Sequence, residues 1–341
     1  MNRERQSVRI GLTVIICALV LRLFTGGTLE PALGWLTSPQ GSSVLLYLET
    51  GRIFRFSPRE TAPATVPTAA PAVSETTAPT TPLPADTLPC FSPADTDLIS
   101  LSNNCGYTPD LEAMLLSPLS WDLTQGGPAV LIVHTHATES YTPTQAYLSS
   151  SDYRTLDNGY NMVAIGRQVA AVLEAGGIEV LHDKALHDHP SYTGAYQSSR
   201  ESIQAYLEAY PSIRMVLDIH RDAAETAYGQ LKTSATVDGA ASSQLMMVVG
   251  TDAGGLDHPY WQKNMALAIQ LTAYLEKQWP GLTKPISFRS QRFNQDLSPG
   301  AMLIEVGAAG DTQEEALLAA KILGQAILAL SRGTATAHST S

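Results

Sequence analysis

The segment Leu131-Ile132-Val133-His134-Thr135-His136-Ala137-Thr138-Glu139 joins a short apolar run to two histidines and a glutamate. Short apolar runs of this kind are typical of buried strands in a parallel sheet. In an open α/β sheet, ligands and metals bind beyond the carboxyl ends of the strands, where successive loops converge. The segment therefore predicts a strand of such a sheet, with a candidate site where the strand ends.

Two later segments repeat the pattern of an apolar run that leads into a side chain able to bind metal or transfer protons. Residues 216–219 lead into His220, and residues 302–304 lead into Glu305. The carboxyl ends of parallel strands meet at one edge of a sheet, so these groups can come together although they lie far apart in sequence.

His136, Glu139 and His220 form a ligand set that suits catalytic zinc, which takes three nitrogen or oxygen ligands and leaves one position for water. Glu305 would then be the base that activates this water. A single histidine at a strand end is more often a structural, hydrogen-bonded residue, and a buried glutamate can cap a helix or pair with an arginine. Several such residues at successive strand ends favour a hydrolytic zinc site.

Strands and helices are predicted to alternate from about residue 126 onward. Apolar spacing predicts helices at 161–175, 198–210, 260–279 and 314–330, and strands at 131–133, 178–181, 215–220, 286–289 and 301–306. A hairpin is expected between 231–237 and 244–249, joined through the turn dipeptide Asp238-Gly239. This alternation is typical of a three-layer α/β sandwich with a largely parallel central sheet.

The N-terminal region has the composition of a membrane anchor. Basic residues at positions 3, 5 and 9 precede an apolar run at 10–24 that only Gly11, Thr13 and Arg22 interrupt. This order is typical of a secretion signal or a signal anchor. The run is shorter than the roughly 20 residues of a typical span, but no small-x-small cleavage site follows it. We expect a cytoplasmic N-terminus at 1–8, an uncleaved transmembrane signal anchor at 9–25, and the rest of the chain outside the cytoplasm, at the cell membrane.

A proline-rich segment separates this anchor from the body of the protein. Residues 60–89 contain seven prolines among Thr and Ala, and no Lys or Arg. Such a segment favours extended polyproline geometry, and at ~3.1 Å per residue it could span ~90 Å. We therefore expect a membrane-proximal region at 26–59, a Pro/Thr/Ala-rich linker at 60–89, a pre-domain segment at 90–125, a catalytic domain at 126–332 and a C-terminal tail at 333–341.

Charge and cysteine content narrow the classes of function. The formal net charge of −11, without a basic stripe, argues against a nucleic-acid partner. Of the three cysteines, Cys17 lies in the apolar run, whereas Cys90 and Cys105 follow the linker. These two could form a disulfide in an oxidising exterior or remain free thiols.

Four segments, in order along the chain, together resemble the stage II sporulation protein P family. They are His134–Tyr141 (HTHATESY), Asn161–Gly166 (NMVAIG), Asp218–Asp222 (DIHRD) and Asn294–Gly307 (NQDLSPGAMLIEVG). The resemblance spans about residues 128–330. It implies a membrane-tethered, Zn²⁺-dependent N-acetylmuramoyl-L-alanine amidase of endospore formers, with a fold similar to those of zinc amidases and zinc carboxypeptidases.

The same resemblance implies a biological setting and partners. Members of this family thin septal peptidoglycan during engulfment and are also reported to cut stem-peptide cross-links as endopeptidases. They act with the lytic transglycosylase stage II sporulation protein D. The resemblance thus implies peptidoglycan as substrate, the membrane as anchor and the sporulation septum as location.

The resemblance leaves the first zinc ligand open between His134 and His136. Classical zinc amidases place a Gly-rich D-P-G-H turn after the first strand and the ligand glutamate many residues later. Here Glu139 follows His136 by only three residues, as in the H-x-x-E pair of zinc carboxypeptidases. That analogy favours His136, Glu139 and His220 as ligands and Glu305 as the catalytic base. His134 would then orient a ligand or contact the substrate carbonyl.

Three further residues are candidates for contact with the substrate. Arg221, beside His220, could stabilise an oxyanion, although an ion pair with Asp218 or Asp222 is the expected role. Neighbouring strand residues alternate faces, so Arg221 is expected to point away from the metal. Arg154 and Tyr160 lie in or near a polar stretch that is long enough to be an active-site loop.

Two other functions remain open. A zinc carboxypeptidase that trims stem peptides would need a buried arginine to bind a terminal carboxylate, and the sequence does not single one out. A non-catalytic, tethered peptidoglycan-binding module would need no intact site. The complete set of His136, Glu139, His220 and Glu305 counts against this second alternative.

Overall fold

The computed structural model describes residues 88–119, 121–124, 126–143, 153–223, 225–226 and 229–336. The chain divides into two compact units, Met1–Thr76 and Thr77–Ser341, and all described residues belong to the second unit. The predicted anchor at 9–25, its flanking regions at 1–8 and 26–59, and nearly all of the linker at 60–89 lie outside the described residues. Within the described part, no helix combines the length and the hydropathy that a membrane span requires.

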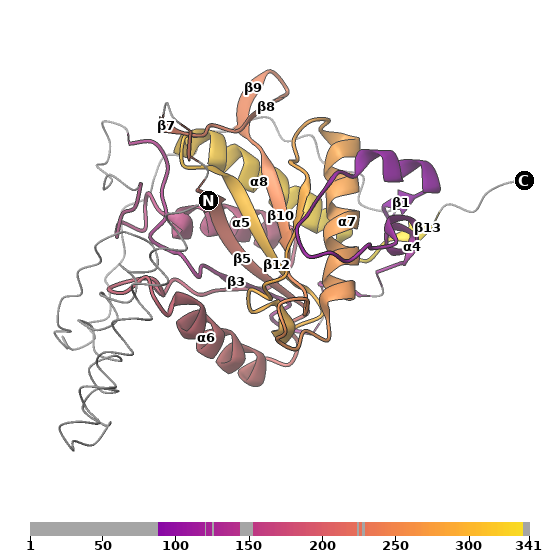
Figure 1. Ribbon diagram of the computed structural model, residues 1–341, viewed down its shortest axis with the longest axis horizontal. Coiled ribbons are helices and arrows are strands. Elements are labelled where there is room, and N and C mark those ends of the chain that lie inside the picture. Colours follow the sequence, from indigo (N-terminus) through magenta and orange to yellow (C-terminus); the bar gives the residue numbers. More distant parts are fainter. Residues whose placement is uncertain are drawn as a thin grey trace, which may run out of the picture. The chain divides into compact units, whose positions relative to one another are not determined.

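A seven-stranded sheet forms the centre of the described region, in the order β2-β11-β10-β12-β5-β3-β4 (Figure 1). Its strands are β2 (Leu101–Asn103), β3 (Val130–Val133), β4 (Val180–His182), β5 (Met215–Asp222), β10 (Leu245–Val249), β11 (Ile286–Phe288) and β12 (Ala301–Ala308). Neighbouring strands run parallel except β10 and β12, which are antiparallel. The prediction of a largely parallel sheet is therefore confirmed.

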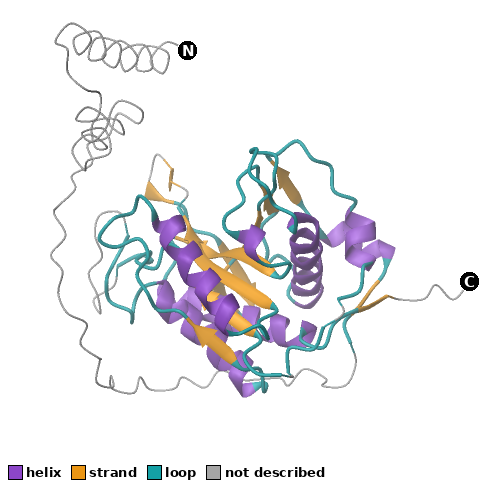
Figure 2. Cartoon of the chain, turned by 90° about the horizontal axis from the view of Figure 1, so that it is seen from below, coloured by secondary structure: helices purple, strands orange, loops and turns teal. Residues whose placement is uncertain are grey.

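Helices and short strand pairs surround this sheet (Figure 2). The helices are η1 (Pro93–Leu98), α4 (Leu111–Leu116), α5 (Met162–Ala175), α6 (Ala195–Ala209), α7 (Trp261–Gln278), η2 (Gln295–Leu297) and α8 (Gln313–Leu330). The pairs are β1 (Cys90–Phe91) with β13 (Ala335–Thr336), β6 (Glu225–Thr226) with β7 (Gly229–Gln230), and β8 (Ser234–Val237) with β9 (Ala240–Ser243). Cys90 and Cys105 are both free thiols.

Local side-chain chemistry explains where two of the core-facing helices, α5 and α8, begin. The Asn161 side chain accepts a hydrogen bond from the Val163 amide at the start of α5, at 3.0 Å. Thr312 and Glu315 form a capping box at the start of α8. Both devices satisfy backbone N–H groups that have no partner inside the helix, and so they stabilise the first turn.

Alternate residues of the central strands face opposite sides of the sheet, as the two-residue period of a strand requires. On one face, Ile132 and Leu217 belong to the larger apolar core, to which α5, α7 and α8 contribute. On the other face, Leu131 and Val133 form a smaller cluster with Ile203 of α6. Helices therefore pack on both faces, and the predicted three-layer sandwich is confirmed.

The expected hairpin was correct at its turn but not in its second strand. Asp238 and Gly239 both have positive φ, 51° and 81°, and they join β8 to β9. A two-residue turn sets the partner strand to begin directly after it, so the pair ends at Ser243. The apolar run of β10 instead lies inside the central sheet, where burial on both faces suits it.

Helix α6 packs on only part of one face of the sheet, and the pocket lies on the part that α6 leaves uncovered. The cluster that includes Ile203 of α6 draws its sheet residues from the β3 side, namely Leu131, Val133, Val216 and Ala301. On the neighbouring strands β10 and β12, Val248 and Leu303 line a pocket instead. The sheet face thus carries apolar packing at one end and an open pocket at the other.

Candidate active site

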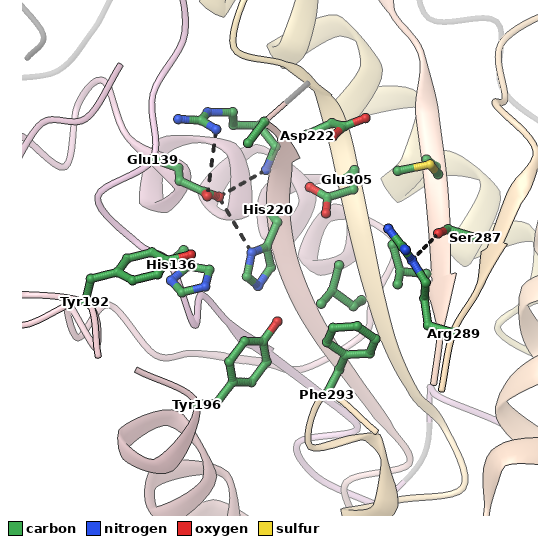
Figure 3. Close-up of a pocket in the computed structure, with 15 residues that line it drawn as sticks. His136, Glu139, Tyr192, Tyr196, His220, Asp222, Ser287, Arg289, Phe293 and Glu305 are labelled. Atoms are coloured by element: carbon green, nitrogen blue, oxygen red, sulfur yellow. Dashed lines mark hydrogen bonds and ion pairs between the residues drawn. The ribbon is translucent and has the colours of Figure 1, made fainter. Parts of the chain in front are cut away.

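A pocket of about 230 Å³ lies on this face of the sheet (Figure 3). The four residues predicted together as a zinc site, His136, Glu139, His220 and Glu305, all line it. They come from two strands and from the loop after β3. The pocket therefore brings together groups that are separated by up to about half of the chain.

His220 and Glu305 lie inside their strands, whereas the sequence predicted them at or near the strand tips. They are direct partners in the parallel register of β5 and β12, which continue to Asp222 and Ala308. The ladder between these strands shifts its register between Glu305 and Ala308, where Gly307 has a φ of 72°. A β-bulge of this kind bends the strand, and it ends the regular pairing just after Glu305.

Asp218 fixes the start of the loop that carries His136. The Thr135 amide and hydroxyl donate hydrogen bonds to the Asp218 carboxylate at 2.8 and 2.6 Å. Next to it, the His136 ring stacks on Tyr192, with ring centres 4.4 Å apart and planes 8° apart. Burial lowers the pKa of His136 to about 4, so the ring is neutral at pH 7 and its nitrogens are available as ligands.

Glu139 lies in a buried ionic network. Its carboxylate is 3.3 Å from Arg154 Nη2, 3.8 Å from Arg221 Nη1 and 3.6 Å from His220 Nδ1. Burial alone would raise the pKa of Glu139, but the contact with His220 and the charge of Arg221 outweigh burial and lower it to about 2. Glu139 is therefore ionised at neutral pH, as a metal ligand requires.

A second carboxylate orients His220. Asp218 Oδ1 is 2.8 Å from His220 Nε2, in an ion-pair contact that is not aligned as a hydrogen bond. Burial opposes the charge of the ring, yet Asp218 and Glu139 together raise the pKa of His220 well above its usual value. A carboxylate on one ring nitrogen fixes the imidazole and leaves the other nitrogen, Nδ1, toward Glu139.

Glu305 is the isolated acid of the pocket. Its Oε2 is buried and has no hydrogen-bond partner among the described residues. Burial raises the pKa of Glu305 to about 8, with a smaller opposing effect from His220 and a further increase from Glu139. A carboxyl group with a raised pKa, buried beside histidine, has the properties of a general acid–base residue.

The donor set fits zinc, although no cage is preformed. Among the described residues, no group of three or more His, Cys, Asp or Glu side chains stands ready to hold a metal. Three buried atoms of the pocket nevertheless have no hydrogen-bond partner in the described region: His136 Nδ1, His220 Nε2 and Glu305 Oε2. With Glu139 as the carboxylate, His136 and His220 make a ligand set of catalytic zinc, and Glu305 stays outside this set as the candidate base. In this structure the Glu139 carboxylate is in contact with Arg154 and Arg221.

His134 lies outside the pocket. Its Nδ1 is 3.0 Å from the Ile219 carbonyl oxygen, and its Nε2 is 2.9 Å from His182 Nε2. A side chain at Gly166 on α5 would collide with the His134 ring, so this ring lies directly against the helix. Of the two histidines that the sequence left open as first ligand, the structure places His136 in the pocket and His134 behind it.

Of the three candidates for contact with the substrate, the structure places only Arg221 in the wall of the pocket. Arg221 donates hydrogen bonds to the carbonyl oxygens of Ser140 and Tyr153, at 3.0 and 3.1 Å, so its guanidinium group holds the loop. Arg154 bonds to Asp188 at 2.6 Å and to Glu139. Tyr160 is not among the residues that line the pocket.

The ion pair expected for Arg221 was assigned to the wrong partners. Its carboxylate neighbour is Glu139, whereas Asp218 binds Thr135 and contacts His220. Asp222 pairs with Lys284 at 2.7 Å. The sequence could not indicate this, because the partner of Arg221 comes from the loop after another strand.

Tyr192, Tyr196, Arg289 and Phe293 line the pocket but were not among the predicted site residues. One signal was available in the sequence: Tyr196 lies in the first turn of α6, and Tyr192 precedes this helix in the same Tyr- and Ser-rich stretch. Arg289 and Phe293 lie on the segment that follows β11. Nothing in the sequence relates that segment to His136.

Comparisons with known proteins agree on one family. A family model described as "Stage II sporulation protein P (SpoIIP)" matches residues 74–328. Stage II sporulation protein P of Bacillus subtilis (strain 168) is 27% identical over 197 residues, which cover 54% of this chain and 47% of that protein. The chain thus spans about half the length of this relative.

Solved structures show a more distant similarity. The amidase AmiC2 of Nostoc punctiforme is 16% identical, with a TM-score of 0.33, over 61% of this chain and 97% of that one. The CwlD amidase from Clostridioides difficile, solved with the GerS lipoprotein, is 13% identical, with a TM-score of 0.37, over 59% and 94%. Ami1 from Mycobacterium smegmatis is 13% identical, with a TM-score of 0.35, over 62% and 99%. Similarity at this level does not establish a shared function.

Proposed function

Since the chain belongs to the stage II sporulation protein P family, we propose that it is a zinc-dependent peptidoglycan hydrolase that cleaves the amide between N-acetylmuramic acid and L-alanine. The observation that carries this proposal is the convergence of His136, Glu139, His220 and Glu305 in one pocket. Two histidines, an ionised carboxylate and a separate buried acid are the parts that metal-assisted amide hydrolysis requires.

In this proposal His136, Glu139 and His220 hold the metal, and Asp218 keeps the His220 ring in place. A bound zinc ion supplies a Lewis acid for the amide carbonyl and lowers the pKa of water toward ~7. The ionised form of Glu305 takes a proton from the attacking water. As the carbon–nitrogen bond breaks, Glu305 gives that proton to the leaving amine of L-alanine. Arg154 and Arg221 keep Glu139 ionised and fix its position.

The stabilising donor for the developing oxyanion is assigned to Tyr196, because the guanidinium group of Arg221 is bound to the loop. Figure 3 shows the Tyr196 hydroxyl directed into the pocket on the side of His220. Within the described residues this hydroxyl has no hydrogen-bond partner, although the ring packs edge-on against His136 at 5.5 Å. A phenol is protonated at neutral pH and can donate to a negative oxygen.

We expect Tyr196→Phe to lower kcat by roughly 100-fold with little change in KM, because the donor acts mainly on the transition state. The ring that packs on His136 is retained, so the pocket should keep its shape. Steady-state kinetics on a soluble muropeptide measures the effect. Tyr206→Phe, on the same helix but outside the pocket, is the matched control and should leave kcat and KM unchanged. An unchanged kcat in Tyr196→Phe would remove this residue from the mechanism.

The proposal also includes the setting of the enzyme. The anchor at 9–25 and an extracytoplasmic catalytic domain at the cell membrane are supported by the order of segments in the sequence. Action at the septum during engulfment is supported by the family alone. Cleavage of stem-peptide cross-links and cooperation with the lytic transglycosylase stage II sporulation protein D are the further activities that the family implies. The carboxypeptidase alternative would need a buried arginine for a terminal carboxylate, and Arg221, which is buried in the pocket, is instead bound to backbone carbonyl groups.

The experiment that tests the function identifies the cleaved bond. The full-length protein is incubated with purified peptidoglycan as prepared, after treatment with a chelator, and after zinc is returned, and the products are identified by mass spectrometry. We expect stem peptides with a free L-alanine amino group, lost on chelation and restored by zinc. Cut cross-links without free stem peptides would replace the amidase with an endopeptidase. Cleavage that is insensitive to the chelator would contradict the proposed zinc chemistry.

A further inference from the structure

The arginines around the pocket differ in whether a carboxylate neutralises them. Arg154 pairs with Asp188 and Glu139, and Arg221 lies 3.8 Å from Glu139. Arg289 also lines the pocket, but no carboxylate of the described residues forms an ion pair with it. Its side chain instead donates from Nε to the Ser287 hydroxyl at 3.0 Å. The outer nitrogens of this guanidinium group are left for another partner.

The acids on the pocket wall do not neutralise Arg289 either. Glu139 is held by two arginines, and Asp222 is paired with Lys284 at 2.7 Å. Glu305 Oε2 has no hydrogen-bond partner among the described residues, Arg289 included. Within the described residues, Arg289 is therefore an arginine of the pocket without an ion-pair partner, and it lies on the wall formed after β11.

The sheet register fixes the distance between Arg289 and the reacting groups. Val248 of β10 pairs with Leu303 of β12 on one side and with Ser287 of β11 on the other. Neighbouring strands are 4.7–4.9 Å apart, so β11 lies about 10 Å from the strand that carries Glu305. Figure 3 shows Arg289 and Tyr192 at opposite ends of the pocket, with His220 and Glu305 between them.

This arrangement matches the geometry of a peptide that continues from the scissile amide. Two extended residues span about 7 Å, which is within reach of a long arginine side chain across the strand spacing. A guanidinium group binds a carboxylate through two parallel N–H···O bonds, and such charge-assisted bonds are about twice as strong as neutral ones. A carboxylate two residues into the leaving peptide would therefore be placed at Arg289 when the amide is at Glu305.

We propose that Arg289 forms a carboxylate-binding subsite that selects peptides carrying a free carboxyl group on the second residue of the leaving stem peptide. In peptidoglycan this residue is a glutamate linked through its side chain, so its α-carboxyl group is free or amidated. The subsite deepens the proposed amidase function and rests on it. It predicts that amidation of this one carboxyl group makes the substrate poorer.

The test compares two soluble muropeptides that differ only in whether this α-carboxyl group is free or an amide. The full-length wild-type protein should favour the free acid in kcat/KM by roughly 10- to 100-fold, mainly through KM. Arg289→Gln should bring this ratio to about one, and Arg289→Lys should keep part of it. Arg214→Gln, an arginine outside the pocket whose side chain bonds to the Pro211 carbonyl oxygen, removes the same charge and should keep the whole preference.

Calorimetric binding of the same two muropeptides to Glu305→Gln gives a readout that does not depend on turnover. The free acid should bind more tightly, and the added change Arg289→Gln should abolish the difference. Equal affinity and equal kcat/KM for both muropeptides in the wild type would overturn the subsite, as would a preference that survives Arg289→Gln. If the wild type cleaves neither muropeptide, the proposed function fails, and the binding difference alone then decides the subsite.

Discussion

Replacing Glu305 with glutamine is expected to lower kcat by roughly three orders of magnitude and to leave the fold intact. Glutamine has the same shape but cannot accept the proton of water at neutral pH. The substitution should break no hydrogen bond of Oε2, because Glu305 Oε2 has no hydrogen-bond partner among the described residues. Removing a buried acid that has no counter-ion should also leave the melting temperature unchanged or slightly higher.

Single-turnover kinetics on a muropeptide, together with thermal unfolding, separates the two effects. Glu208→Gln, an exposed position on α6, is the matched control and should retain full activity. Substrate binding should survive in Glu305→Gln, since the lost step is proton transfer. If Glu305→Gln keeps more than about a tenth of the wild-type kcat, the general base must be sought elsewhere in the pocket.

The second large effect is expected from His136→Ala, which removes a proposed zinc ligand. Loss of one of three protein ligands should leave zinc below stoichiometric amounts after dialysis and lower kcat/KM by at least about 100-fold. The site also loses the ring that stacks on Tyr192 at 4.4 Å. Zinc content by atomic emission spectroscopy and activity with added zinc are the two measurements.

His134→Gln is the informative comparison for this experiment. His134 is fully buried and bonds to His182 and to the Ile219 carbonyl oxygen, so its replacement should lower stability. The zinc content of the folded protein should remain close to that of the wild type. The opposite outcome, with zinc lost in His134→Gln and kept in His136→Ala, would show that the ligand assignment is reversed.

The parts of the fold that follow local periodicity could be predicted from the sequence. The apolar spacing of 161–175 and 314–330 predicted α5 and α8, and both agree with the structure within one residue at each end, where side-chain caps define the start. The run at 131–133 marked β3 for the same reason, since it is buried on both faces. Such patterns arise from the contacts that a single segment makes with the layers packed directly against it.

The order of the strands could not be predicted in this way. The antiparallel strand β10 lies between β12 and β11, and this order is what brings Arg289 into the same pocket as Glu305. The predicted hairpin assigned the β10 segment to a partner close in sequence, although its actual partners begin about forty residues later. Pairing between distant segments depends on the packing of the whole sheet, which no local pattern records.

The part of the site that could be predicted from the sequence is the set of residues able to bind metal or transfer protons. His136, Glu139, His220 and Glu305 were chosen because each can bind metal or transfer protons after an apolar run, and they do lie in one pocket. Their use as ligands and base remains a prediction. The role of Arg221 was not predictable, since its guanidinium group is held by carbonyl oxygens of the loop after β3.

The pairing of the first and last strands of the described region has a consequence for how the chain folds during synthesis. β1 pairs with β13 in the register Cys90 with Ala335, and β2 pairs with β11 across nearly two hundred residues. During synthesis, β2 has no partner until β11 has been made, and β1 has no partner until β13 has been made. Contacts between such distant segments slow folding. The central sheet therefore cannot be completed before β11 and β12 have been synthesised, and truncations that remove β12 should prevent it from forming.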